Sequence, residues 1–398
     1  MNNLLTKVTD EEIKNGVEDE FGVVYSEDGI KLLRCNNKYL VDYTIKTDTK
    51  ILCDNAFFDC FSLKTIDIPD SVTSMGECTF TGCWSLLSIT IPNTIKNIRF
   101  RTFYGCEALQ HVSIPNSVSI IENEAFCGCL SLNQIRIPNS VIEIGCGVFN
   151  KIFNLEVICD SNRFITYNHM LIERQTSRLL SYYGSESYVV IPKFVIIIGD
   201  KAFEGYVKLQ QVIITDSVTS IGCSAFSGCL SLQQVIIPNS VTSIGNWTFS
   251  ACESLEQIVI PHSVTHIGDA VFSGCESLIQ IIISNSITKI GYQTFERCEA
   301  LKDITLPESL KDIGDWVFDG CKSLQKIIIP HSVTSIGDWD LEGCEALRQI
   351  ILPDSITSIG EWYLDECDSL KEISVPHGSI ERFKKMLNKE LWDKLIEQ

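Results

Sequence analysis

Apolar side chains recur along this chain at fixed places in a block of 23 residues. A leucine marks each block, as Leu63, Leu86 and Leu109 show, and a proline follows six residues later, as at Pro69 and Pro92. Self-similarity at this length predicts a solenoid, in which each block forms one coil that stacks on the next. Residues that return in every coil are therefore expected to serve stacking and not catalysis.

The block from Leu232 to Leu255 indicates which element each part of a coil should form. Val235 points inward from a short strand of alternating inward and outward residues, and Pro238 ends this strand because proline has no amide hydrogen. Gly245 is expected to supply a backbone angle that other residues avoid, and Phe249 to fill the widest part of the coil. Each block thus predicts one strand of a parallel sheet, then a turn and a return segment.

Departures from the repeat predict how the chain is divided. Residues 1–39 are expected to form an N-terminal cap with a short helix and a hairpin. Coils occupy residues 40–376, where a longer spacing near 162–185 predicts a second, inserted hairpin. Residues 377–398 carry apolar side chains at helical spacing, which predicts a helix that caps the last coil, with a partner-binding helix as the alternative.

Short motifs support the two predicted hairpins and the first helix. Thr9 and Glu12 have the spacing of a capping box, in which each side chain satisfies a backbone amide at the start of a helix. Asp28 and Gly29 form a tight-turn signal between two apolar runs. The runs in residues 168–172 and 179–183 predict the inserted hairpin.

The cysteines follow the same repeat. Of the 18 cysteines in the chain, one column stands three residues before the leucine: Cys60, Cys83, Cys106, Cys129, Cys229, Cys252, Cys275, Cys298, Cys321, Cys344 and Cys367. Since Ile152 and Tyr206 take the same place in two coils, we interpret the column as buried free thiols, although adjacent coils would also permit disulfide geometry. Cysteines and histidines are not spaced as zinc ligands, so neither a metal nor any other cofactor is expected.

Charge and hydropathy limit the partners. The net charge of -19 argues against nucleic acid, and no apolar run is long enough for membrane insertion. The acidic stretch from Asp338 to Glu372 predicts a solvated end, with a docking surface for a basic partner as the alternative. The first residues show no signal peptide, so a cytoplasmic location is expected by default, with the cell surface or secretion as alternatives.

Two outward positions of each strand form the main candidate site, on the concave side of the sheet. One position is largely glutamine and the other is aliphatic in the second half of the chain. The candidate protein-binding residues are Gln211, Ile213, Gln234, Ile236, Gln257, Val259, Gln280, Ile282, Ile328, Gln349 and Ile351. A continuous exposed aliphatic row is typical of a contact surface. The alternative is β-propensity alone, reinforced by stacking of like residues in neighbouring strands.

A second candidate patch consists of Trp316, Trp339 and Trp362, which occupy one place in three successive coils, each beside an acidic residue. Tryptophan is favoured at the centre of interfaces, but these three could equally pack against the C-terminal segment. The sequence contains no recognisable catalytic motif, so we do not expect an enzyme. A carbohydrate-binding or enzymatic site at the inserted hairpin would require converging polar groups near His169 and Glu173.

The pattern Cys-x-x-Leu-x-x-Ile-x-Ile-Pro-x-Ser-Val-x-x-Ile-Gly-x-x-x-Phe, which residues 229–249 follow without a gap, closely resembles the BspA-like leucine-rich repeats. The resemblance extends from Leu40 to Pro376, and the hairpin segments resemble insertions common among bacterial members. It implies an α/β solenoid of the leucine-rich-repeat type: a right-handed coil of about 13 to 14 turns, with a parallel concave β-sheet and short irregular or helical convex segments.

The same resemblance implies a function. Some relatives are surface proteins that bind host extracellular proteins or promote cell–cell adhesion. The expected function is therefore non-catalytic protein binding, adhesin-like or as an interaction scaffold, with a host or cell-surface protein or a second copy of the chain as partner. An intracellular scaffold without a fixed ligand is the alternative.

Overall fold

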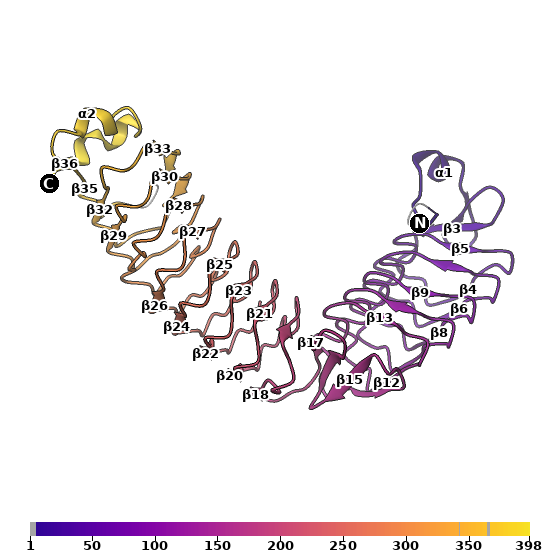
Figure 1. The fold of residues 1–398 in the computed structure, drawn as a ribbon. Coiled ribbons are helices and arrows are strands. Elements are labelled where there is room, and N and C mark those ends of the chain that lie inside the picture. Colours follow the sequence, from indigo (N-terminus) through magenta and orange to yellow (C-terminus); the bar gives the residue numbers. More distant parts are fainter. Residues whose placement is uncertain (1–4, 342, 364–366) are drawn as a thin grey trace. The chain divides into compact units, whose positions relative to one another are not determined.

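A computed structural model describes residues 5–341, 343–363 and 367–398, and the chain forms a parallel β-solenoid of about 16 turns with ~23-residue spacing (Figure 1). This is slightly more than the 13 to 14 turns expected. The chain divides into two compact units, Met1–Ser185 and Glu186–Gln398, which are described in turn below. The division falls directly after the inserted hairpin that the sequence places near 162–185.

The first unit begins with a cap of one helix and three antiparallel strands. These elements are α1 (Asp10–Asn15), β1 (Val17–Glu18), β2 (Val23–Tyr25) and β3 (Lys31–Cys35). Thr9 and Glu12 form the predicted capping box: the Thr9 hydroxyl accepts from the Glu12 amide at 3.2 Å, and the Glu12 carboxylate accepts from the Thr9 amide at 2.9 Å. Residues 1–39 thus contain a short helix and a hairpin formed by β2 and β3.

Each coil of the first unit contributes a longer main strand, and all but the last also contribute a two-residue minor strand. The main strands are β4 (Asp42–Thr44), β6 (Thr65–Asp67), β8 (Ser88–Thr90), β10 (His111–Ser113), β12 (Gln134–Ile137) and β14 (Glu156–Cys159). The minor strands are β5 (Ile51–Leu52), β7 (Ser74–Met75), β9 (Asn97–Ile98), β11 (Ile120–Ile121) and β13 (Glu143–Ile144). Paired strands run parallel, as Thr65 opposite Asp42 illustrates.

The insertion has three antiparallel strands, one more than the hairpin predicted. They are β15 (Phe164–Tyr167), β16 (Met170–Glu173) and β17 (Arg178–Tyr182). The connection between β15 and β16 consists of Asn168 and His169, which have φ angles of 45° and 56°. Two successive residues with positive φ form the turn type that matches the twist of a hairpin, so this turn is tightly specified.

The second unit repeats the same two rows (Figure 1). Its main strands are β18 (Tyr188–Val190), β20 (Gln211–Ile213), β22 (Gln234–Ile236), β24 (Gln257–Ile260), β26 (Gln280–Ile283), β29 (Lys326–Ile328), β32 (Gln349–Ile351) and β35 (Glu372–Val375). Its minor strands are β19 (Ile197–Ile198), β21 (Ser220–Ile221), β23 (Ser243–Ile244), β25 (His266–Ile267), β27 (Lys289–Ile290), β28 (Asp312–Ile313), β30 (Ser335–Ile336) and β33 (Ser358–Ile359). A further pair, β31 (Trp339–Asp340) and β34 (Trp362–Tyr363), joins the last coils.

Helix is confined to the caps in the part of the chain that the structure describes. The convex segments of the coils, expected to be short and either irregular or helical, are turns and two-residue strands. A helical turn rises too little per residue to return the chain within one 23-residue coil that already holds two strands.

The core of each unit is a ladder of phenylalanine rings. Phe203, Phe226, Phe249 and Phe272 are fully buried, and neighbouring ring centroids lie 5.0 to 5.8 Å apart with nearly parallel planes. The first unit repeats this arrangement, as the Phe80–Phe103 pair at 5.7 Å shows. Leu341 continues the column as a buried residue, whereas Leu364 lies outside the described residues.

The cysteine column packs beside this ladder as free, buried thiols. The Cys252 thiol donates to the Phe226 carbonyl oxygen at 3.3 Å, and the Cys275 thiol donates to the Phe249 carbonyl at 3.2 Å. From Cys83 onward, each thiol of the column thus supplies a weak hydrogen bond to the coil before it, in a place where alanine or valine would leave a carbonyl without that donor. Burial raises the pKa of Cys275 to about 12, which keeps the thiol protonated.

Gly245 serves a different purpose from the one expected. It does not have a positive φ; a Cβ there would lie only 2.5 Å from the Cys223 backbone nitrogen of the preceding coil. The positive φ belongs to Trp247, at 54°. Glycine is therefore required at 245 for the close approach of two coils, and the prediction of a special backbone angle is wrong.

The C-terminal segment is not one continuous helix, as the sequence predicted, but three short elements. They are α2 (Ile380–Phe383), the 3-10 helix η1 (Lys389–Lys394) and β36 (Leu395–Glu397). Strand β36 pairs in parallel with β35 and so supplies hydrogen bonds to a strand that would otherwise be an open edge. The apolar residues of the segment still cover the last coil, since Phe383, Leu387, Leu391 and Leu395 are buried.

Candidate functional site

The outward side of the main strands, here called the strand face, carries the predicted binding residues of the second unit. The glutamines Gln211, Gln234, Gln257 and Gln280 are directly opposite one another in adjacent strands. The aliphatic row beside them is exposed: Ile213 by 37%, Ile236 by 64%, Val259 by 52%, Ile282 by 52% and Ile328 by 50%. We call this row the aliphatic stripe.

The stripe is interrupted once, between β26 and β29, and it ends after β29. The sequence pattern did not show either feature clearly. Thr305 and Asp303 occupy the two outward positions between β26 and β29, and there the strands reduce to isolated bridges to Ile282 and Lys326. Beyond Ile328 the row fades, because Ile351 is half-buried and Ser374, the next partner, is buried. The uninterrupted part of the row therefore spans β18, β20, β22, β24 and β26, because Val190 of β18 lies opposite Ile213 and is also exposed.

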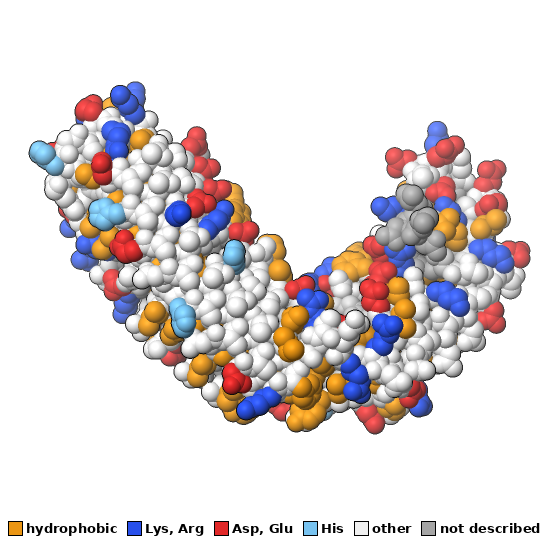
Figure 2. Space-filling model, viewed as in Figure 1, with side chains coloured by type: hydrophobic (Ala, Val, Ile, Leu, Met, Phe, Trp, Pro, Cys, Tyr) orange, Lys and Arg blue, Asp and Glu red, His pale blue; other side chains and the backbone are white. Residues whose placement is uncertain are grey.

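In the space-filling view, apolar side chains recur along the margin of the second unit where these strands lie (Figure 2). Acidic residues stand in the turns that precede several of the strands. Glu276 pairs with Arg297 at 3.6 Å, and Glu299 pairs with Lys322 at 2.7 Å. The stripe is thus an uncharged surface with charged groups beside it.

The three tryptophans do not form one exposed patch. Trp316 is 37% exposed and meets Tyr292 edge-on, with ring centroids 5.0 Å apart. Trp362 is buried, with 3% exposure, and its carbonyl accepts a hydrogen bond from Asn388 of the C-terminal cap at 3.1 Å. The side chain of Trp339 lies outside the described part of the structure. For Trp362 the burial and the hydrogen bond from Asn388 favour the alternative that the sequence left open, packing against the C-terminal segment, over a shared surface patch.

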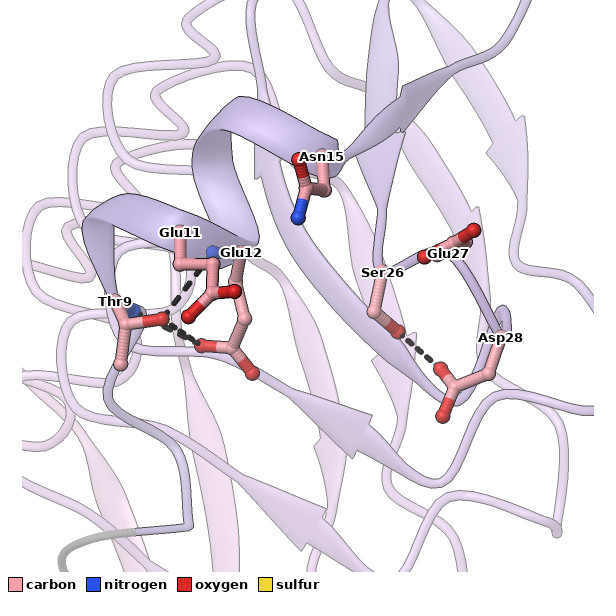
Figure 3. Close-up of a pocket in the computed structure, with 7 residues that line it drawn as sticks. All are labelled: Thr9, Glu11, Glu12, Asn15, Ser26, Glu27 and Asp28. Atoms are coloured by element: carbon pink, nitrogen blue, oxygen red, sulfur yellow. Dashed lines mark hydrogen bonds between the residues drawn. The ribbon is translucent and has the colours of Figure 1, made fainter.

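A pocket in the N-terminal cap is lined by Thr9, Glu11, Glu12, Asn15, Ser26, Glu27 and Asp28 (Figure 3). Glu12 on α1 already accepts from Lys31 at 2.6 Å, which lowers the pKa of its carboxyl, and Asp28 accepts from the Ser26 hydroxyl. These acids stabilise the helix start and the hairpin turn. Among the described residues no group of three or more His, Cys, Asp or Glu side chains could hold a metal ion.

Polar residues do converge at the inserted hairpin. A shallow pocket of about 320 Å³ is lined by Asn154, Leu155, Glu156, Val157, Thr166, Tyr167, Asn168, His169 and Tyr183. His169 is among them, as the sequence suggested, and its ring meets Tyr183 edge-on at 5.9 Å. Glu173 is not, and its carboxylate instead accepts from the Thr176 hydroxyl within the hairpin turn.

A larger groove, which the sequence did not predict, lies on the strand face of the first unit. It encloses about 680 Å³ above β8, β10, β12 and β14, and Glu156 lines both this groove and the hairpin pocket. Its lining residues are Ser88, Ile89, Thr90, His111, Val112, Ser113, Ile114, Asn133, Gln134, Ile135, Arg136 and Glu156. The available signal was the row of polar residues at outward strand positions, which differs from the second half of the chain.

Stacked coils, a sheet of parallel main strands and a ladder of leucine, phenylalanine and cysteine define the class of this protein as a leucine-rich-repeat solenoid. A family model described as BspA type leucine rich repeat region, in 6 copies, matches residues 34–164, 179–302 and 288–389. The chain belongs to this family. A search of curated proteins gave no match.

Similar solved structures come from bacteria. A leucine-rich repeat protein from Bacteroides ovatus is 27% identical, with a TM-score of 0.56 and coverage of 98% of this chain and 99% of that chain. A leucine rich cell surface protein from Faecalibacterium prausnitzii is 30% identical, with a TM-score of 0.56 over 72% of this chain and 85% of that chain. A leucine-rich repeat protein from Eubacterium ventriosum is 24% identical, with a TM-score of 0.65 over 86% of this chain and 93% of that chain. This similarity supports the fold.

None of the described helices has the length and apolar character needed to cross a membrane. The family and the fold therefore establish a repeat scaffold built from the columns that the sequence displays.

Proposed function

We propose that this protein is a non-catalytic binder of proteins, adhesin-like or acting as an interaction scaffold, and that the aliphatic stripe is its contact surface. The observation that carries the proposal is the exposure of Ile236, Val259 and Ile282, each more than half exposed on adjacent main strands. Exposed aliphatic rows of this kind mark contact surfaces, because water contact with them is unfavourable and a partner removes it.

The rigid sheet beneath the stripe favours this use. The strands pair in register and hold the side chains of the stripe in fixed positions. Binding of a partner would therefore cost little conformational entropy on this side of the interface. The glutamine row offers amide donors and acceptors along the edge of the apolar centre. An uncharged centre with a polar rim is the common anatomy of protein interfaces.

Charge indicates the kind of partner. The chain carries a net charge of -19, and the exposed residues Glu253 and Glu256 stand just before the main strand β24 of this region. The best match is a protein with its own apolar row and basic residues around it. A second copy of the chain would bring like charges together, which makes self-association the weaker form of the proposal.

Similarity to a leucine rich cell surface protein supports an adhesin-like role outside the cell. An intracellular scaffold would use the same stripe on a different partner. Both versions depend on the stripe and not on the location.

The test is the double variant Ile236→Asp with Ile282→Asp. It places two charges in the centre of the stripe, and we expect loss of cross-linking between a photoreactive residue at position 259 and partner proteins from host or bacterial surface fractions. The matched control is Ile196→Asp with Leu230→Asp, which adds the same charges at exposed apolar sites outside the stripe, 43% and 37% exposed.

Both double variants should keep the thermal midpoint and the far-UV circular dichroism of the parent protein, since all four positions are at the surface. Equal cross-linking by the folded stripe variant and the parent protein would refute the proposal. Sedimentation of the parent and stripe variants would identify self-association.

A further inference from the structure

We propose that the first unit has a second, independent binding site: the strand-face groove and the hairpin pocket together form a polar trough that binds a neutral oligosaccharide. The two hollows share Glu156 as a lining residue, so they adjoin at β14, one over β8 to β14 and the other at the β15–β16 hairpin. All of these elements belong to the first unit, whereas the aliphatic stripe belongs to the second.

The trough is built from hydrogen-bonding side chains of mixed type. Outward positions of β8 and β10 provide the hydroxyls of Ser88, Thr90 and Ser113 and the imidazole of His111. Hydroxyl groups donate and accept equally well, as sugar hydroxyls do. An aliphatic stripe is lacking here, so the surface offers little to the apolar anchor residues that dominate protein interfaces.

The charged residues of the trough are already paired. Arg136 donates to both carboxylate oxygens of Asp160, from Nε at 2.6 Å and from a terminal nitrogen at 3.1 Å. Gln134 donates to the Glu156 carboxylate at 2.6 Å. These pairs fix the side chains in position and balance Arg136 locally. The trough is therefore a poor site for a polyanion, such as nucleic acid or a sulfated glycan, and a suitable one for an uncharged polar chain.

The hairpin closes one end of the trough with an aromatic wall. Tyr167, the last residue of β15, is 46% exposed beside the two-residue turn that contains His169. Because both turn residues have positive φ, the turn defines the backbone from which this ring projects. A half-exposed tyrosine presents an apolar ring and a polar hydroxyl together, which suits the apolar face and hydroxyl edge of a sugar ring.

The spacing of the trough also fits a chain of sugars. Adjacent strands repeat at ~4.8 Å, and one pyranose unit of an extended chain has a similar length. Each strand can therefore meet one sugar unit with its own pair of outward side chains. Four main strands and the hairpin wall should accommodate about four to five units, by the same spacing.

The experiment is isothermal titration of the full chain with linear neutral hexasaccharides: maltohexaose, cellohexaose, xylohexaose, mannohexaose and chitohexaose. We expect saturable binding of at least one of them. Titration with its shorter homologues should give an affinity that rises with chain length up to about four or five units and is not much higher for the hexasaccharide. A heparin hexasaccharide is the anionic comparison. Failure of every neutral hexasaccharide to bind, or binding of heparin alone, would overturn the proposal.

Three variants locate the site. Tyr167→Ala and Gln134→Ala each remove one contact and should weaken binding about tenfold. Ser113→Arg fills the middle of the groove from an exposed position and should abolish binding without disturbing the core. Each variant is first checked by its thermal midpoint, and binding that survives in a folded Ser113→Arg protein would place the sugar elsewhere and refute the trough.

The stripe variant Ile236→Asp with Ile282→Asp is the matched control and should bind the oligosaccharide as the parent protein does. This control separates the two proposals. If the stripe variant loses protein cross-linking but still binds the oligosaccharide, the two sites are separate. The Ser113→Arg variant should show the opposite result: it should lose oligosaccharide binding and keep protein cross-linking.

Discussion

The strand faces of the two units have the same backbone and opposite chemistry. In the first unit the outward positions hold hydroxyl, amide, imidazole and charged groups, as at Thr90, His111 and Arg136. In the second unit the same positions hold glutamine and exposed aliphatic residues, such as Gln234 and Ile236. The inward columns barely differ between the units. Inward residues therefore maintain the stack, and outward residues are free to serve different partners.

The largest expected effect tests the shared core. Phe226→Ala in the second unit and Phe103→Ala in the first should each lower the free energy of unfolding by about 3–5 kcal/mol, because each removes a fully buried ring and leaves a cavity. Ile236→Ala, at an outward position, should change the free energy of unfolding by less than about 0.5 kcal/mol. Urea unfolding of the three variants measures this. A clear difference between the two phenylalanine variants would contradict the equality of the cores.

A smaller effect tests the stacking distance between coils. Gly245→Ala should lower the free energy of unfolding by about 1–3 kcal/mol, because the new Cβ would lie 2.5 Å from a backbone nitrogen of the preceding coil. Gly228→Ala is the matched comparison: its φ is 70°, and the nearest atom to its Cβ would be 3.6 Å away. It should cost only about 1 kcal/mol, from backbone conformation alone. If thermal or urea unfolding gave the reverse order, close stacking at Gly245 would not be the reason for glycine.

The smallest effect concerns reactivity and leaves stability unchanged. Burial raises the pKa of Cys229 and Cys275 to about 12, so at pH 8 these thiols are protonated and shielded. Cys223 is exposed in the same unit. Iodoacetamide at pH 8 should therefore modify Cys223 in the native protein well before the column, and all of the thiols after unfolding in urea. Mass spectrometry of peptides from a time course measures the order, and early labelling of Cys229 would contradict a closed core.

Sequence spacing predicted the solenoid, the inward columns, the capping box at Thr9 and the turn at Asp28, because each depends on residues within one coil or one turn. It also identified Ile236 and its neighbours as outward residues, since strand alternation assigns the side of the sheet directly. The use of the stripe as a binding surface stays a prediction.

Other features depend on contacts that spacing does not encode. The role of Gly245 comes from a neighbour in the preceding coil, and the burial of Trp362 comes from the cap that covers it. The polar rows of the first unit were visible as residues, but the groove above them was not, because a hollow depends on which side chains are short and on how adjacent strands are placed.

By itself, the sequence determined the period, the core columns and the inward or outward direction of each strand residue, because burial of apolar side chains at a fixed interval allows only stacked coils. The tertiary structure decided how the ends are closed. Phe383, Leu387, Leu391 and Leu395 suit a helix by their spacing, yet the last main strand needs hydrogen-bond partners at its open edge. The chain satisfies both demands with a short helix, a 3-10 turn and one more strand.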